Sequence, residues 1–225
     1  MELASGERTC VILPAKTFSQ GKTRLRSKLT DRARSELARA LFQRSLQVSL
    51  QCPSVTTTYV VTNGDDVAEL ARSATPPAQR EVLRDPGPGS LANLMDWALH
   101  QAWLRGSQRA LIIMADLPAV QSADLEAVCS ALDACDCVLV PDRRGRSTNA
   151  FGLHLPFPGR TAFGHESSLA LHRGQARALG LRTRVLSNDR IAHDVDVPED
   201  LGSGPAGLYG FPGDVAQVAG KHGGW

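Results

Sequence analysis

The sequence predicts a single-domain α/β protein in which a mainly parallel sheet is flanked by helices on both faces. Short apolar or β-branched segments alternate with longer amphipathic segments through the first two thirds of the chain. That alternation is typical of parallel strands joined by crossover helices. The length of 225 residues is sufficient for one complete hydrophobic core. We therefore expect one domain over residues 1–201, followed by a glycine-rich tail over residues 202–225.

The predicted strands are short and rich in apolar or β-branched residues. The most apolar is Ala110-Leu-Ile-Ile-Met114, and the first, Cys10 to Ala15, ends in small residues. Such continuous apolar segments are expected for strands that are buried on both faces of a sheet. In chain order, the predicted strands are 10–15, 56–62, 81–84, 110–114, 137–140, 149–155, 182–186 and 193–197.

The predicted helices carry apolar residues at helical spacing, as Leu37 and Leu41 do in the longest of them. Asp31 and Ser122 are expected to cap two of these helices, and Ser167 is expected to open a third. In chain order, the predicted helices are 31–50, 67–72, 90–104, 122–132 and 167–179. Ligands of such folds bind beyond the carboxyl ends of the strands, so the residues that follow each strand are the candidates for a site.

Composition and charge exclude several classes of protein. The formal net charge of +2 argues against a dedicated nucleic-acid binder with a broad basic face. No window reaches the roughly 18 consecutive apolar residues of a membrane span, and residues 1–9 lack an apolar signal core, so we expect a cytoplasmic protein. The five cysteines do not stand at zinc-ligand spacings, which favours buried thiols.

The basic residues near the N-terminus indicate a phosphate site. Four of the 25 basic residues are lysines, and three of these lie within the first 28 residues. Lys16, Lys22 and Arg24 follow the first strand, where cationic side chains and backbone N–H groups bind polyphosphates well. The Gly21-Lys-Thr sequence is not a P-loop, since Lys16 stands where that motif requires glycine. A solvated basic loop, with lysines retained by chance in an arginine-rich chain, is the alternative interpretation.

Three carboxylates lie at the expected ends of strands. Asp116 follows the most apolar predicted strand, whereas Asp194 and Asp196 alternate in the last one and would project from the same face. Such a group of oxygen ligands suits Mg²⁺, which also coordinates substrate phosphates. The alternative is that Asp194 or Asp196 only caps a turn before Pro198.

A second anion site is predicted before the last helix. Gly164 and Ser167 offer free N–H groups, a hydroxyl and the positive end of the helix dipole, although a simple N-cap is the commoner role of such a serine. The chain has no G-x-S-x-G sequence and no recognisable catalytic cysteine motif. In-line phosphoryl or nucleotidyl transfer needs no protein nucleophile and fits this set of residues.

These segments together resemble the guanylyltransferases of coenzyme F(420) biosynthesis, which activate 2-phospho-L-lactate, phosphoenolpyruvate or 3-phospho-D-glycerate. The matching stretches run in the family's order from residue 11 to residue 201. They are Leu13-Pro-Ala-Lys16, Gly21-Lys-Thr-Arg-Leu25, Val60-Val-Thr-Asn63, Asp116-Leu-Pro118, Pro141-Asp142, Thr148-Asn-Ala150, Phe163-Gly164, Ser167, His172 and Asp194-Val-Asp-Val-Pro-Glu-Asp-Leu201.

The resemblance implies a nucleotide-diphospho-sugar transferase-like fold of the GT-A type. It also implies Mg²⁺-dependent transfer of GMP from GTP to the phosphate of a three-carbon acid, with release of pyrophosphate. The implied catalytic residues are Lys16, Lys22 and Asp116, and the implied metal ligands are Asp116, Asp194 and Asp196. The implied nucleotide-binding residues are Leu13, Ala15, Lys16, Lys22, Arg24 and Asn63. The implied acceptor-binding residues are Thr148, Gly164 and Ser167.

Departures from the family pattern concern the acceptor. The family has Gly-x-Gly-Ser where this chain has Gly164-His-Glu-Ser167, so that Glu166 replaces a glycine, and an asparagine is displaced by one position to Asn93. A carboxylate beside an anion site is explained if it accepts a hydrogen bond from a substrate hydroxyl. We hypothesise that Glu166 or His165 contacts such a hydroxyl and favours 3-phosphoglycerate over phosphoenolpyruvate, which has none.

Two other functions remain as alternatives. A molybdopterin or sugar-phosphate nucleotidyltransferase would share the fold, but these proteins usually carry a glycine-rich first loop where this chain has Leu13-Pro-Ala-Lys16. A non-catalytic nucleotide-binding module would not require the three carboxylates. The sequence leaves open the acceptor, GTP against ATP, the role of the tail, and the oligomeric state, for which a homodimer is one option.

Overall fold

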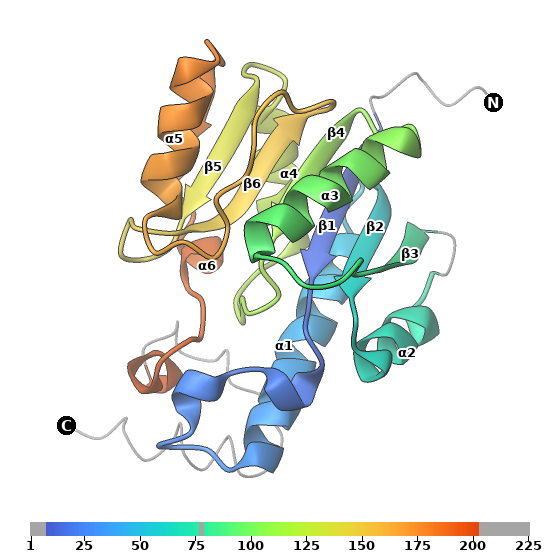
Figure 1. Ribbon diagram of the computed structural model, residues 1–225, viewed down its shortest axis with the longest axis vertical. Helices are drawn as coiled ribbons and strands as arrows, with labels where there is room; N and C mark the ends of the chain where they lie inside the picture. The colour runs from blue at the N-terminus through green and yellow to red at the C-terminus, as the bar shows by residue number, and fades with distance from the viewer. Residues whose placement is uncertain (1–7, 77–78, 203–225) are drawn as a thin grey trace.

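The computed structural model describes residues 8–76 and 79–202, so the predicted tail, apart from Gly202, lies outside the described residues. Within these ranges, seven strands form one sheet in the order β3-β2-β1-β4-β6-β5-β7 (Figure 1). The strands are β1 Thr9–Pro14, β2 Val55–Thr62, β3 Arg80–Arg84, β4 Arg109–Ile113, β5 Cys137–Pro141, β6 Thr148–His154 and β7 Thr183–Val185.

The sheet is mainly parallel, as predicted. Parallel pairing joins β3, β2, β1 and β4 in turn, and it also joins β5 to β7. β6 runs antiparallel to both of its neighbours, β4 and β5. The link between β5 and β6 is the short segment 142–147, which is long enough for a hairpin but too short for a parallel crossover. The reversal brings the start of β6 to the edge at which the parallel strands end.

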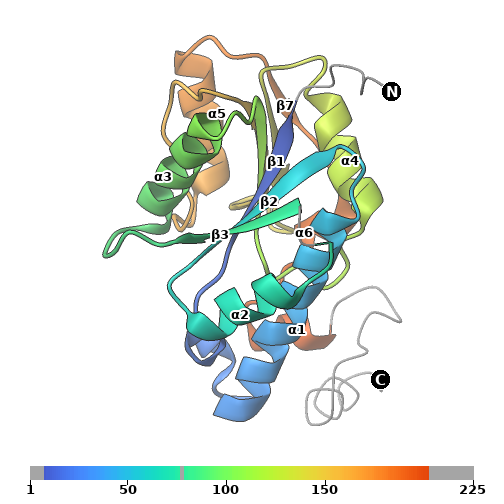
Figure 2. The same ribbon diagram turned by 90° about the vertical axis from the view of Figure 1, so that its right-hand side faces the viewer.

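Helices cover both faces of the sheet (Figures 1 and 2). α1, α2 and α4 pack on one face, whereas α3 and α5 pack on the other. The helices are α1 Asp31–Leu50, α2 Asp65–Ser73, α3 Leu91–Leu104, α4 Ser122–Ala131, α5 Ser168–Ala178 and α6 Asp189–Ala192. The three layers confirm the predicted fold class. No helix of the described residues has both the length and the apolar character needed to cross a membrane.

The central strands are apolar throughout because a helical layer covers each face. In β1, Val11 and Leu13 belong to the core on the side of α1, whereas Cys10 and Ile12 belong to the core on the side of α3. All four side chains are fully buried. Removing such a side chain from water contributes roughly 1.5–3 kcal/mol to folding. The other cysteines are buried as well.

A third, smaller core fastens two loops to the first half of α1. Leu25 and Leu29 enter it from the loop after β1, and Val195 and Leu201 enter it from the segment after α6. Both segments pack on the same helix, so the basic loop and the acidic segment 194–196 lie side by side (Figure 1). This contact between distant parts of the sequence positions the candidate site.

Two predicted helix caps are wrong by one residue. Thr30, rather than Asp31, caps α1, and its hydroxyl accepts a backbone N–H of the first turn. Gln121, rather than Ser122, occupies the N-cap of α4, where it forms a capping box with Asp124. Several polar residues suited to capping are adjacent at each helix start, so the sequence pattern does not distinguish between them.

The predicted strand 193–197 is not a strand. The short helix α6 precedes the segment, and the sheet ends at β7. The segment is tied to the end of β4 by a hydrogen bond from the Val195 N–H to the Asp116 carbonyl oxygen, at 3.2 Å. Asp194 and Asp196 nevertheless face the same side, as predicted, since both line one cleft while Val195 between them is buried.

Candidate active site

Two clefts open at the edge of the sheet where the parallel strands end. The larger, of about 910 Å³, lies beyond β1 and β2, and is termed here the β1 cleft. The smaller, of about 380 Å³, lies beside the start of β6 and is termed the β6 cleft. The residues that line both clefts are Arg24, Leu91, Met114, Asp116 and Asp196. The two clefts therefore meet at two of the predicted carboxylates.

An acidic centre lies at this junction. Asp116, Asp194 and Asp196 each offer a carboxylate oxygen, and these three oxygens lie within 4.8 Å of one another. Burial raises the pKa of Asp194 to about 6, and the charge of Asp116 acts in the same direction. Asp116 Oδ1 is buried, and it has no hydrogen-bond partner among the described residues. A buried, unpartnered carboxylate oxygen beside two further carboxylates fits a divalent cation that prefers oxygen ligands.

Lys22 contacts this acidic centre directly. Its Nζ lies 2.8 Å from Asp116 Oδ2 and 3.1 Å from Asp196 Oδ1. Burial opposes the charge of the ammonium group, but the two carboxylates outweigh it and raise the pKa of Lys22. The ammonium therefore neutralises part of the acidic centre.

The backbone at Lys22 is unusual, with a φ of +52° in the left-handed region. Non-glycine residues adopt this conformation rarely and at some energetic cost. The preceding residue is held by Arg34 of α1, whose guanidinium donates to the carbonyl oxygen of Gly21 at 2.8 Å. Arg34 is almost completely buried. Its role was not predictable from the sequence, because nothing near position 34 indicates a partner 13 residues earlier.

The β1 cleft contains most of the predicted nucleotide-binding residues. Ala15, Lys16, Lys22, Arg24 and Asn63 all line it. Lys16 is exposed there, and Arg24 approaches Asp196 at 3.7 Å. Leu13 does not line the cleft, since its side chain is fully buried in the core. A direct side-chain contact between Leu13 and a nucleotide is therefore excluded by its position on β1.

The β6 cleft contains most of the predicted acceptor-binding residues. Thr148, Gly164, His165 and Glu166 line it, but Ser167 does not. Ser167 is exposed and its side chain caps nothing.

The next residue, Ser168, faces the cleft. It lines the cleft, is buried, and accepts the Thr148 N–H at 3.0 Å. Ser167 is the N-cap of α5, as the pattern predicts, and Ser168 is the first helical residue. Two adjacent serines match the same sequence pattern equally well, and only their burial separates their roles.

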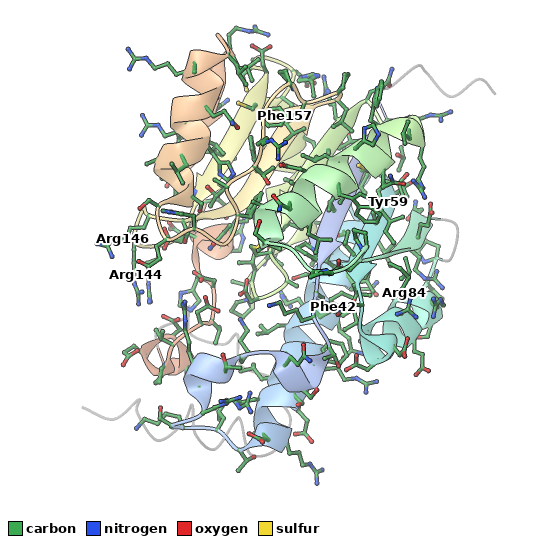
Figure 3. The ribbon with its side chains drawn as sticks, in the orientation of Figure 1. Phe42, Tyr59, Arg84, Arg144, Arg146 and Phe157 are labelled. Carbon is green, nitrogen blue, oxygen red and sulfur yellow. The ribbon has the colours of Figure 1, made fainter. Side chains whose placement is uncertain are left out.

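Arginines form one rim of the β6 cleft. Arg143, Arg144 and Arg146 come from the turn between β5 and β6, and Figure 3 shows Arg144 and Arg146 close together at that turn. Asp142 shapes the turn, because its Oδ1 accepts the backbone N–H of Arg146 and the next one along the chain. No role for these arginines was predicted from the sequence. A cationic rim favours an anionic ligand.

Two further polar residues hold the acidic segment in place. Asn149 Nδ2 donates to the Ile191 carbonyl oxygen at 2.9 Å and to Asp194 Oδ1 at 3.3 Å. Asp200 Oδ2 accepts the N–H groups of Asp196 and Val197, both at 2.8 Å. Neither residue was assigned a role from the sequence, where Asn-Ala and Pro-Glu-Asp-Leu appeared only as parts of longer matching stretches.

The arrangement suits transfer of a charged group between two ligands. The β1 cleft offers lysines and backbone for a polyphosphate, and the β6 cleft offers hydroxyls and arginines for a second anion. The acidic centre with Lys22 lies between them, where a bound cation and the ammonium group would neutralise charge that develops during such a transfer.

Comparison with known proteins agrees with this geometry. Residues 9–204 match the family described as guanylyl transferase CofC like. A phosphoenolpyruvate guanylyltransferase of Sphaerobacter thermophilus is 32% identical over 195 residues, which are 86% of this chain and 90% of that protein. A 3-phospho-D-glycerate guanylyltransferase of Phenylobacterium zucineum is 29% identical over 192 residues, which are 83% of this chain and 86% of that protein.

Solved structures share the fold at low sequence identity. A putative nucleotide-diphospho-sugar transferase from Desulfovibrio desulfuricans G20 has a TM-score of 0.73 at 17% identity, covering 96% of this chain and 95% of its own. A nucleotidyl transferase from Methanothermobacter thermautotroptrophicus has a TM-score of 0.59 at 17% identity, covering 87% of this chain and 94% of its own. The fold of nucleotide-diphospho-sugar transferases that the sequence resemblance implied is thus confirmed. The match over residues 9–204 shows that the chain belongs to the CofC-like guanylyl transferase family.

Proposed function

We propose that the chain is a Mg²⁺-dependent guanylyltransferase that transfers GMP from GTP to the phosphate of a phosphorylated three-carbon acid in coenzyme F(420) biosynthesis. An oxygen of the acceptor phosphate attacks the α-phosphorus of GTP and forms the new P–O bond. The bond from the α-phosphorus to the oxygen that bridges to the β-phosphorus breaks, and pyrophosphate leaves with that electron pair. The observation that carries the proposal is the acidic centre at the junction of the two clefts.

Each group of residues has a role in this reaction. Lys16, Arg24 and the loop before Lys22 bind the triphosphate in the β1 cleft. Asp116, Asp194 and Asp196 hold Mg²⁺, which supplies charge neutralisation at the phosphoryl groups when bound. Lys22 adds positive charge at the same place. Binding of both substrates on one rigid edge of the sheet gives the in-line approach that such transfers require.

The acceptor occupies the β6 cleft. Thr148, Ser168 and the backbone near Gly164 bind its anionic groups, and the arginine rim attracts it electrostatically. Some relatives are named for phosphoenolpyruvate and others for 3-phosphoglycerate. The acceptor of this chain must therefore be inferred from the residues of its own β6 cleft. We propose that Glu166 or His165, both exposed at the cleft, contacts the free hydroxyl of 3-phosphoglycerate. The Glu166 carboxylate would accept the hydrogen bond of that hydroxyl, whereas His165 would donate to it through Nε2, because its Nδ1 accepts the Ser167 N–H at 3.1 Å.

Pyrophosphate release tests the reaction and its metal requirement. Purified protein is incubated with GTP or ATP and each of the three acids, with Mg²⁺ or with EDTA. We expect release with GTP, one or more of the acids, and Mg²⁺. Asp116→Asn should reduce turnover at least about 100-fold, as for loss of a metal ligand that positions the reacting groups, while the exposed Asp189→Asn leaves it unchanged. Silence with every acid, or full turnover by Asp116→Asn, would refute the proposal and favour a nucleotide-binding module.

The acceptor preference has its own test. Competition among the three acids should favour 3-phosphoglycerate in the wild-type protein, and Glu166→Gly should shift the preference toward phosphoenolpyruvate. A wide preference for phosphoenolpyruvate that Glu166→Gly leaves unchanged would show that Glu166 does not select the acceptor.

A further inference from the structure

His172 of α5 is a buried histidine that contacts the β6 cleft only through another residue. Its imidazole lies between two groups: the Ala162 N–H, which donates to Nε2 at 2.7 Å, and Thr148 Oγ1, which lies 3.0 Å from Nδ1. The side chain is 2% exposed and is enclosed by the rings of Phe151 and Phe163, at centroid distances of 4.8 and 5.0 Å. Thr148 lines the cleft, whereas His172 does not.

The hydrogen bond from Ala162 determines the tautomer of His172. A backbone N–H can only donate, so Nε2 must be unprotonated and must act as the acceptor. Burial lowers the pKa of His172 to about 4, which keeps the ring neutral near pH 7. In a neutral imidazole with an unprotonated Nε2, the proton is carried by Nδ1. Nδ1–H therefore donates to Thr148 Oγ1.

This donation determines what the Thr148 hydroxyl can do. Its oxygen accepts from His172, so its own proton must be directed to a different acceptor. The hydrogen bonds within residues 8–76 and 79–202 include no protein acceptor for that proton. The neighbouring hydroxyl of Ser168 likewise accepts the Thr148 N–H, and its own proton has no acceptor within the described part of the chain. The buried floor of the β6 cleft thus presents hydroxyls that accept from the protein and can donate to a ligand.

We propose that His172 is a positioning residue that fixes the Thr148 hydroxyl as a hydrogen-bond donor to an anionic group of the acceptor. The proposal rests on the proposed function, because it assigns the β6 cleft to that acceptor. His172 touches neither substrate and transfers no proton in the reaction. Its effect is on the binding of the acceptor, and the nucleotide in the β1 cleft is not affected.

Kinetics of four proteins test the proposal: wild type, His172→Gln, Thr148→Val and the double variant. Glutamine reaches the position of Nε2 but leaves Thr148 Oγ1 without its donor. His172→Gln should raise the KM for the acid about tenfold, the size expected for one hydrogen bond to a charged group, with kcat and the KM for GTP within about twofold. In the Thr148→Val background, the same substitution should have almost no further effect.

His100, an exposed histidine of α3, provides the matched control, and His100→Gln should change none of these constants. The proposal is overturned if His172→Gln raises the KM for the acid equally with and without the Thr148 hydroxyl, or raises the KM for GTP as much. Either result would mean that His172 supports the fold in general and does not orient the Thr148 hydroxyl. Absence of turnover in the wild type is a different result, which refutes the proposed function and this assignment of the cleft with it.

A measurement on the unmodified protein covers the case in which His172→Gln does not fold. Protein labelled with ¹⁵N at histidine shows by NMR which ring nitrogen of each histidine carries the proton. We expect the His172 signals of the Nδ1–H tautomer, unchanged between about pH 5.5 and pH 8. An Nε2–H tautomer or a cationic ring in that range would overturn the proposal, whatever the turnover of the enzyme.

Discussion

Lys22 provides the sharpest prediction about stability, because its ammonium group contacts two of the three carboxylates of the acidic centre. Lys22→Met keeps most of the length and packing of the side chain but removes its charge. The contacts at 2.8 Å to Asp116 and at 3.1 Å to Asp196 are lost. Three carboxylates within 4.8 Å of one another then repel without the neutralising ammonium. We expect the variant to be markedly less stable than the wild type in the absence of divalent cations.

The burial of the three groups determines the size of the effect. Removing one partner of a buried ion pair costs about 3–5 kcal/mol of unfolding free energy. The Lys22 side chain is 9% exposed, but those of Asp116 and Asp196 are 24% and 43% exposed, so water screens part of the repulsion. We therefore expect a loss of about 2–3 kcal/mol. For a chain of this length, this corresponds to a decrease in Tm of roughly 5–10 °C.

Thermal unfolding in EDTA and then in Mg²⁺ measures both parts of this argument. Lys28→Met is the matched control, because Lys28 lies on the same loop and is exposed. If the acidic centre binds Mg²⁺ as proposed, the cation should raise the Tm of Lys22→Met more than that of the wild type, since it replaces the lost positive charge. A Lys22→Met protein that unfolds in EDTA within about 1 °C of Lys28→Met would refute the electrostatic reasoning.

Three further predictions concern residues that support the site. The pKa of His172 is about 4 in the native state against 6.5 as its ordinary value, so only the unfolded chain binds this proton as the pH falls from about 6.5 toward 4. Native stability should decrease by at most about 3 kcal/mol over that range, and urea unfolding at pH 7.5 and 4.5 should show a smaller decrease for His172→Gln. Asp200→Ala removes the acceptor of the Val197 N–H, and a Mg²⁺ titration of turnover should show weaker activation, whereas an unchanged midpoint would contradict this role. Arg34→Met frees the carbonyl of Gly21 and should raise the KM for GTP several-fold while leaving that for the acid unchanged.

Most of the fold follows from local patterns in the sequence. The strand Thr9–Pro14 and the helix Asp31–Leu50 lie within a residue of their predicted bounds at most ends, because an apolar run, a cap and a helical repeat are each visible over a few residues. The segment 193–197 is an exception. Its alternation of Asp and Val predicts a strand, but it is held by a hydrogen bond to Asp116 and by packing of Val195 on α1. These contacts join parts of the chain that are far apart in the sequence, and no local pattern contains that information.

The acidic centre was predictable because each of its carboxylates stands at a position that the fold brings to one edge. The contact between Lys22 and these carboxylates was not predictable in the same way. It depends on the small core in which Leu25 and Val195 pack together on α1, although they are far apart in the sequence. Lys22 was assigned to the triphosphate from the sequence alone, and its ion pairs with Asp116 and Asp196 come from that packing.

The reversal of β6 explains why one edge of the sheet holds two binding clefts. In a purely parallel sheet this edge would receive only residues that follow strands, such as Asp116 after β4. Because β6 is antiparallel, the edge also receives residues that begin a strand, and the Met114 N–H donates to the Asn149 carbonyl oxygen across the two strands at 3.0 Å. The reversal therefore places Thr148 next to the acidic centre, and the hairpin turn before it supplies the arginine rim. The nucleotide side and the acceptor side are thus built from different segments, so substitutions on the β5–β6 hairpin can change the acceptor while the β1 cleft keeps its nucleotide.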